Sequence, residues 1–205
     1  DWNLDAVGTM TMAGLWHRPW FFARSGETIS EAYVREAETV RRTVGLCDVT
    51  SLGKIAIQGP DATELLNRVY SNPFAKLQIG KTRYGIMLRD DGLVMDDGTT
   101  WRLTEDEYFM TTTTAHAGKV MAFLEELLQT RWTDLKVHLT SVSEQWAGVA
   151  VAGPLSREVL TACVEQPTRV SDEALPFMGV VETTMREGIP ARIARISFSG
   201  AVSYT

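Results

Sequence analysis

The sequence is poor in cysteine and histidine and contains no long apolar run. Its two cysteines, Cys47 and Cys163, lie far apart, which excludes a disulfide framework and favours a reducing compartment. The histidines His17, His116 and His138 are scattered without metal-ligand spacing, so we expect no metal site and a structural role for each. No run approaches the roughly 18 apolar residues of a membrane span, and the N-terminus lacks the pattern of a signal peptide. We therefore expect a cytoplasmic protein with no membrane partner.

Positive charge is also in short supply. The 20 lysines and arginines are outnumbered by 26 aspartates and glutamates, which gives a net charge of -6. A nucleic-acid partner is not expected, because phosphate binding needs an excess of basic residues. The 44% hydrophobic content is that of an ordinary globular protein, and 205 residues suffice for one large domain or a compact pair. The chain opens on Asp1 and stops at Thr205 in a strand-like segment, so we expect a piece of a longer polypeptide.

The common catalytic motifs are absent. The sequence has no G-x-G-x-x-G, no P-loop, no G-x-S-x-G and no His-Glu-x-x-His. Flavin or nicotinamide chemistry is therefore not expected within this segment.

Local patterns predict a mixed helix and strand content. Residues 1–25 are rich in aromatics without periodicity, which favours an arm or linker, and residues 26–205 are assigned to one domain. A helix is predicted from Thr28 to Val44, opened by a capping box of Thr28 and Glu31. A hairpin region is predicted from Arg83 to Leu103.

One strand and helix unit occurs twice. A strand at residues 54–58 is followed by Gly59-Pro60 and a short helix with a cap-like Asp61, and Gly153-Pro154 repeats this arrangement 94 residues later. Gly85 and Gly179 keep the same offset. The sequence therefore predicts an α+β fold of two tandem related units with mixed or antiparallel sheets.

The pair Asp96-Asp97 is the strongest candidate for a functional site. It lies between the apolar run 93–95 and the strand-like segment 99–103, where a buried carboxylate needs a partner or a ligand. The alternative is a solvated turn, since Gly98 follows the pair. The similar Asp90-Asp91-Gly92 has the chemistry of a hairpin turn.

Aromatic and hydroxyl side chains surround this pair. Tyr84, Trp101 and the tract Thr111–Thr114 lie on flanking strands, and strand alternation places some of them beside the carboxylates. Such walls suit a flat heteroaromatic ligand. Alternatively, the aromatics belong to the core and the threonines follow β-propensity alone.

Several segments in order resemble the folate-binding aminomethyltransferase fold of the glycine cleavage T-protein. They are residues 44–49, 51–55, 58–62 and 80–88. Residues 14–20, 96–100, 110–115 and 145–147 resemble more closely the family of alpha subunits of heterotetrameric sarcosine oxidases. The resemblance covers nearly the whole chain and implies a T-protein fold that is truncated at its C-terminus.

This resemblance implies an activity and a site. A flavin centre elsewhere would oxidise sarcosine, and the resulting imine would react here with tetrahydrofolate to give methylenetetrahydrofolate and glycine, with hydrogen peroxide as the other product. Asp97 would be the catalytic carboxylate, stabilising the cationic folate amine and taking its proton. Asp96, Tyr84, Trp101 and Thr113 would complete the pterin site. Flavin and NAD would be bound elsewhere in the complex, the other subunits would be partners, and the segment alone would not be an active oxidase.

Two departures from the family pattern keep alternatives open. Ala201 stands where the family has a pterin-binding glutamate, and Thr205 stands where an acidic residue is common. One alternative is therefore a non-catalytic docking module that uses Trp16, Trp20 and Phe21. The other is an aminomethyltransferase of the glycine cleavage system.

Overall fold

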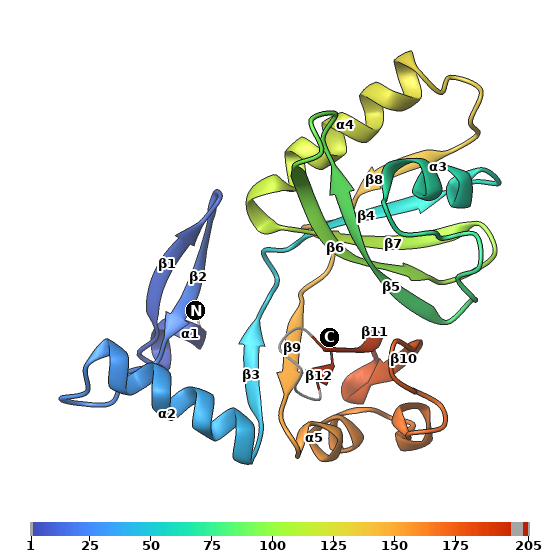
Figure 1. Cartoon of the computed structure of the whole chain (residues 1–205). Coiled ribbons are helices and arrows are strands. Elements are labelled where there is room, and N and C mark those ends of the chain that lie inside the picture. The colour runs from blue at the N-terminus through green and yellow to red at the C-terminus, as the bar shows by residue number, and fades with distance from the viewer. Residues whose placement is uncertain (1, 198–202, 205) are drawn as a thin grey trace. The chain divides into compact units, whose positions relative to one another are not determined.

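The computed structural model describes residues 2–197 and 203–204, and the chain divides into two compact units (Figure 1). One unit comprises Leu52–Ala147 with Met178–Val180, and we call it the hairpin unit. The other comprises Asp1–Ser51, Gly148–Phe177 and Val181–Thr205, and we call it the terminal unit. The predicted boundary between residues 25 and 26 stays a prediction.

The hairpin unit is a five-stranded antiparallel sheet with helices on one face (Figure 1). The strand order is β5 (Lys81–Leu88), β6 (Val94–Arg102), β7 (Glu107–Thr112), β4 (Gly53–Gln58) and β8 (His138–Ser141). The helices are α3 (Ala62–Val69), the short 3-10 turn η1 (Thr114–His116) and α4 (Ala117–Thr130). Apolar residues of α3 and α4 form one buried core with alternate residues of the strands, among them Ile55, Met87, Tyr108 and Met110.

The terminal unit contains a second five-stranded sheet. Its strand order is β10 (Val180–Met185), β11 (Ile189–Ile196), β12 (Ser203–Tyr204), β9 (Val149–Ala152) and β3 (Gly45–Asp48). The helix α5 (Ser156–Cys163) and the 3-10 turns η2 (Pro167–Val170) and η3 (Arg186–Gly188) accompany it. A smaller core around Val164 and Leu175 holds this unit together.

The first 42 residues contribute little to either core. They form α1 (Trp2–Asp5), a two-stranded sheet of β1 (Thr9–Ala13) and β2 (Trp16–Phe21), and α2 (Ile29–Arg42). The predicted capping box is confirmed, since the Thr28 hydroxyl accepts from Glu31 N–H and the Glu31 carboxylate accepts from Thr28 N–H. Among residues 2–42 only Phe21 and Ala32 are buried.

The predicted duplication is confirmed by the sheets. The helix α5 lies 94 residues after α3, and the strand orders β5-β6-β7-β4-β8 and β10-β11-β12-β9-β3 correspond position by position. Gly179 is not the counterpart of Gly85, however, because it lies just outside β10. Isolated bridges join Tyr70 to Met87 and Val164 to Met185, so the second copy has four more residues before this strand.

The two copies exchange one strand each. β3 precedes β4 in the chain but pairs with β9, whereas β8 precedes β9 but pairs with β4. Each copy therefore supplies an edge strand to the sheet of the other.

One local prediction is wrong in detail. Asp61 occupies the position before α3, but its side chain makes no helix cap. Its carboxylate instead accepts a hydrogen bond of 2.8 Å from the backbone N–H of Lys136, a residue distant in the sequence.

Candidate functional site

The candidate site lies on the hairpin of β5 and β6. The turn is closed by backbone hydrogen bonds between Arg89 and both Gly92 and Leu93, and Gly92 has a left-handed φ of 80°. The prediction that Asp90-Asp91-Gly92 forms a hairpin turn is confirmed.

Asp96 and Asp97 lie inside β6 and not in a turn, so the alternative of a second solvated turn is wrong. In the register of the hairpin, Asp96 stands opposite Met87 and Asp97 stands opposite Ile86. Because consecutive strand residues point to opposite faces, the two carboxylates are separated by the sheet. Met87 belongs to the core beneath the helices, so Asp96 faces that side and Asp97 faces the other.

Asp96 is buried, with 4% of its surface exposed. Its carboxylate accepts from the backbone N–H of Thr113 at 3.2 and 3.3 Å, and it lies 3.3 Å from Nδ1 of His116. These donors replace the water that the carboxylate loses on burial. Asp96 and Thr113 therefore contact each other on the helix side of the sheet.

Asp97 is half-buried and accepts a hydrogen bond of 2.5 Å at Oδ2 from the hydroxyl of Tyr84, whose side chain is exposed. This bond raises the pKa of the Tyr84 phenol, because ionisation would place a phenolate beside a carboxylate. On the opposite side of the hairpin, burial raises the pKa of Tyr70 to about 12, and the charges of Asp96 and Asp97 add to this effect.

Trp101 lies on the same side as Asp97, but only 3% of it is exposed. It packs against Phe109 with ring centroids 5.2 Å apart, and its Nε1 donates to the Thr99 hydroxyl at 2.9 Å. The Thr99 hydroxyl lies 3.0 Å from that of Thr111, so a chain of polar contacts crosses from β6 to β7. In this structure Trp101 is a core aromatic that supports the strand.

The structure thus brings together Tyr84 and Asp97, links Trp101 to the same face through Thr99, and places Asp96 with Thr113 on the other face. His116 was assigned only a structural role, yet it contacts Asp96. Strand alternation was the available signal that the side chains of Asp96 and Asp97 point to opposite faces of the sheet.

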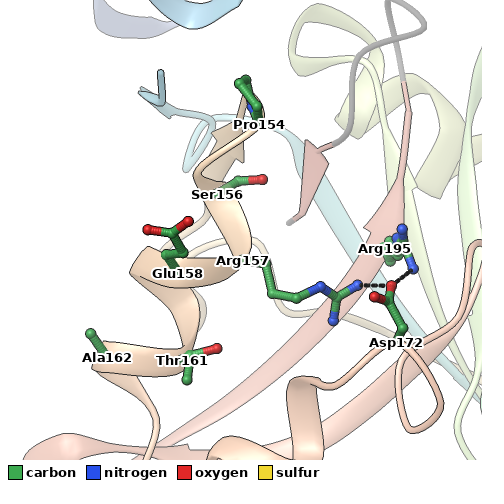
Figure 2. A pocket seen from close by; sticks show the side chains of 8 residues that line it. All are labelled: Pro154, Ser156, Arg157, Glu158, Thr161, Ala162, Asp172 and Arg195. Carbon is green, nitrogen blue, oxygen red and sulfur yellow. Dashed lines mark hydrogen bonds and ion pairs between the residues drawn. The ribbon is translucent and has the colours of Figure 1, made fainter. Parts of the chain in front are cut away.

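An open pocket of about 660 Å³ lies in the terminal unit (Figure 2). Arg157 and Arg195 both point at Asp172, and each donates to its Oδ1 at 2.7 Å. With Glu158 also among the lining residues, the pocket carries two cations and two carboxylates, so it favours neither sign of ligand. It contains none of the predicted site residues.

Two further observations concern the described residues. None of their helices is long and apolar enough to cross a bilayer. They also include no group of three or more His, Cys, Asp or Glu side chains placed to hold a metal ion. Ala201 and Thr205, where the sequence departs from the family pattern, lie outside the described residues.

Comparison with known protein families shows which family this chain belongs to. The model of the GCVT N-terminal domain matches residues 1–204. The chain belongs to this family. Among its relatives, the sarcosine oxidase subunit alpha of Corynebacterium sp. (strain U-96) is 47% identical over 203 residues, and that of Rhizobium meliloti (strain 1021) is 48% identical over 206 residues. These alignments cover 99% and 100% of this chain but only 21% of each relative, so the chain spans about a fifth of their length.

Aminomethyltransferases are more distant members. That of Listeria welshimeri serovar 6b is 32% identical over 165 residues, which is 80% of this chain and 43% of the relative. The structure of glycine cleavage system aminomethyltransferase T from Bartonella henselae has a TM-score of 0.79 at 21% identity, over 99% of this chain and 50% of that chain. A chain of heterotetrameric sarcosine oxidase from Corynebacterium sp. U-96, in complex with pyrrole 2-carboxylate, has a TM-score of 0.56 at 14% identity, over 84% of this chain and 80% of that one. The predicted T-protein fold and its truncation are confirmed.

Proposed function

We propose that this GCVT N-terminal domain is the tetrahydrofolate-binding one-carbon transfer region of a sarcosine oxidase alpha subunit. The oxidation of sarcosine by oxygen would occur at a flavin elsewhere in a hetero-oligomer, together with any NAD site. The other subunits, folate and the imine would be its partners, in the cytoplasm. The match to sarcosine oxidase alpha subunits over the whole chain, against 80% coverage for the aminomethyltransferase of L. welshimeri, supports this choice over a glycine cleavage enzyme.

The observation that carries the proposal is the placement of Asp97. Its carboxylate lies on the face of β6 opposite the helix-covered core and is held by Tyr84. In the part of the chain that the structure describes, its Oδ1 has no hydrogen-bond partner, so this oxygen is available to a ligand.

The second copy of the fold indicates that the scaffold does not need this carboxylate. Arg102 pairs with Tyr108 and Arg195 pairs with Tyr204 at corresponding places in the two sheets. Five residues before each arginine, the first copy has Asp97 and the second has Pro190. The same strand therefore forms without an acidic side chain, which favours a functional role for Asp97.

The residues present fit a folate. Tyr84 offers an exposed aromatic ring and Asp97 an acceptor for N–H groups, the pair of features that a flat heteroaromatic amine needs. Bound tetrahydrofolate would supply the nucleophilic nitrogen of the transfer. The fixed charge of Asp97 stabilises positive charge that develops on that nitrogen, and Oδ1 accepts the proton that it releases.

The test is calorimetric titration of tetrahydrofolate into the full-length subunit in its complex, wild type beside Asp97→Ala. We expect saturable binding to the wild type that the substitution weakens by at least about tenfold, because a charge-assisted hydrogen bond contributes about 1.5–3 kcal/mol. Asp90→Ala is the matched control, since Asp90 is an exposed carboxylate in the turn of the same hairpin. Equal binding by Asp97→Ala and Asp90→Ala would refute the role of Asp97.

A docking role is the second candidate, favoured by the apolar surface of the first 42 residues. Trp20 in β2 is 52% exposed and its ring contacts that of Tyr33 in α2, and Val34 in the same helix is 59% exposed. Phe21 is buried and is not available to a partner. A docking module would show no folate affinity in the intact complex, while the variant Trp20→Glu would release subunits from it.

A further inference from the structure

We propose that Asp96 and His116 form an anchor that positions Asp97 on the face of β6 opposite the helices. Asp96 then acts through the strand and does not touch the ligand itself. The catalytic consequence rests on the proposed function, whereas the anchor itself can be tested without any folate.

The need for an anchor follows from how β6 is held. The ladder between β6 and β7 runs only from Thr100 to Arg102, and the residues of β6 before Thr100 lie outside it. On the β5 side, the register shifts between Met87 and Leu88, so a bulge lies directly before Asp96. The segment that carries Asp97 is therefore paired with β5 but not with β7, and a bulge lies directly before it.

Side chains replace the missing ladder contacts. The Thr111 hydroxyl accepts from Thr99 N–H and donates to the Thr99 carbonyl, both at 3.0 Å. Beyond it, the Asp96 carboxylate accepts from Thr113 N–H and contacts His116, at the point where β7 ends and α4 begins. Asp96 thus ties the part of β6 that has no β7 partner to the start of a helix that is packed into the core.

The burial of Asp96 makes this tie rigid. A carboxylate that is 4% exposed cannot exchange its protein donors for water without opening the sheet. His116 is the more exposed partner, because 40% of its side chain is exposed. Since Asp97 is the next residue along an extended strand, a shift of Asp96 moves the Asp97 carboxylate away from Tyr84.

The Tyr84 phenol reports on this geometry. Its pKa is raised chiefly by the hydrogen bond to Asp97, so loss of that bond lowers it towards the ordinary value of about 10. We would titrate the phenol by NMR in the full-length protein with ¹³C-labelled tyrosine, and the Tyr84→Phe spectrum assigns the signal. Wild type is compared with Asp96→Ala, Asp96→Asn, His116→Gln and Asp97→Asn.

We expect both Asp96→Ala and Asp97→Asn to lower the Tyr84 pKa. His116→Gln should lower it by less than either. Asp96→Asn retains an acceptor for Thr113 N–H but removes the charge of Asp96, which also raises the Tyr84 pKa, so it should lower this pKa by less than Asp96→Ala does. Tetrahydrofolate affinity should fall about fivefold in Asp96→Ala and stay near wild type in Asp96→Asn.

Equal Tyr84 pKa values in folded Asp96→Ala and Asp96→Asn, with an unchanged value in His116→Gln, overturn the anchor, because the lost charge of Asp96 then accounts for the whole effect. If Asp96→Ala does not fold, the His116→Gln titration decides alone. Absence of folate binding to the wild type would refute the proposed function, and the phenol titration would still decide whether the anchor exists.

Discussion

The hydroxyl of Tyr84 donates to Oδ2 of Asp97 across the β5-β6 hairpin, from a side chain that is 43% exposed. Removal of this hydroxyl in Tyr84→Phe keeps the aromatic ring but frees the carboxylate to rotate. We expect tetrahydrofolate to bind about three- to tenfold more weakly to this variant in the full-length complex, since one hydrogen bond at a half-exposed site contributes about 1 kcal/mol. Calorimetric titration measures the change.

The variant Tyr33→Phe is the control for Tyr84→Phe, because Tyr33 is also an exposed tyrosine but lies in α2 of the other unit. Its affinity should equal that of the wild type. A Tyr84→Phe protein with unaltered affinity would show that the phenol is dispensable for binding.

Gly98 permits the close approach of β6 and β7 beside Asp97. A Cβ atom at this position would lie 2.0 Å from the backbone oxygen of Thr111. Gly98→Ala should therefore lower the free energy of unfolding by about 2 kcal/mol or more, because backbone must move to remove the clash. Urea denaturation measures this loss.

The control for this substitution is Gly118→Ala in α4, where a Cβ would meet nothing within 4 Å. Alanine is the better helix former, so this variant should gain up to about 1 kcal/mol. Equal stabilities of the two variants would contradict the tight packing at Gly98.

The hairpin unit should fold without the rest of the chain. Residues 52–147 contain all five strands of its sheet and the whole of its core. They lack Met178–Val180, which form two backbone hydrogen bonds with Gly80 and Thr82. Loss of these bonds should lower the free energy of unfolding by about 2 kcal/mol. We expect a cooperative thermal transition by circular dichroism for residues 52–147 and none for residues 1–51, which bury almost no apolar surface.

Glu27 should make the terminal unit sensitive to acid. Two bonds from Arg35 and one from the Arg24 N–H lower the pKa of Glu27 from 4.5 to about 2. Because the folded pKa is depressed, the stabilisation is complete above the unfolded pKa of 4.5 and disappears as the pH falls towards 2. The difference in urea midpoint between about pH 6 and about pH 3 should be smaller in Glu27→Gln than in the wild type. An identical difference in the two proteins would contradict this assignment.

Local sequence signals predicted what local interactions determine. Thr28 and Glu31 form their capping box with each other. In both copies the Gly-Pro pair directly precedes a short helix, so this feature also depends only on residues close in the sequence. The prediction for Asp61 was wrong because its partner, Lys136, is remote in the sequence. The offset of Gly85 and Gly179 was misleading because four extra residues enter the second copy before β10.

The candidate site shows the same limit. Alternation indicates that Asp96 and Asp97 face opposite ways, but the sequence does not say which side the helices cover. That choice follows from the packing of α3 and α4 on Met87 and its neighbours. Tyr84 and Asp97 stayed together because they share a face in the hairpin register, a property that the turn at Asp90-Asp91-Gly92 sets.

The exchange of edge strands between the two copies has a consequence during synthesis. β3 leaves the ribosome about 100 residues before its partner β9. At about 5–20 residues per second, β3 therefore has no partner strand for roughly 5–20 s. β4 meets β7 sooner and gains β8 only after α4 is made. The nascent chain therefore completes the sheet that carries Asp97 first, and an unpaired β3 is the segment most exposed to chaperones or to a neighbouring nascent chain.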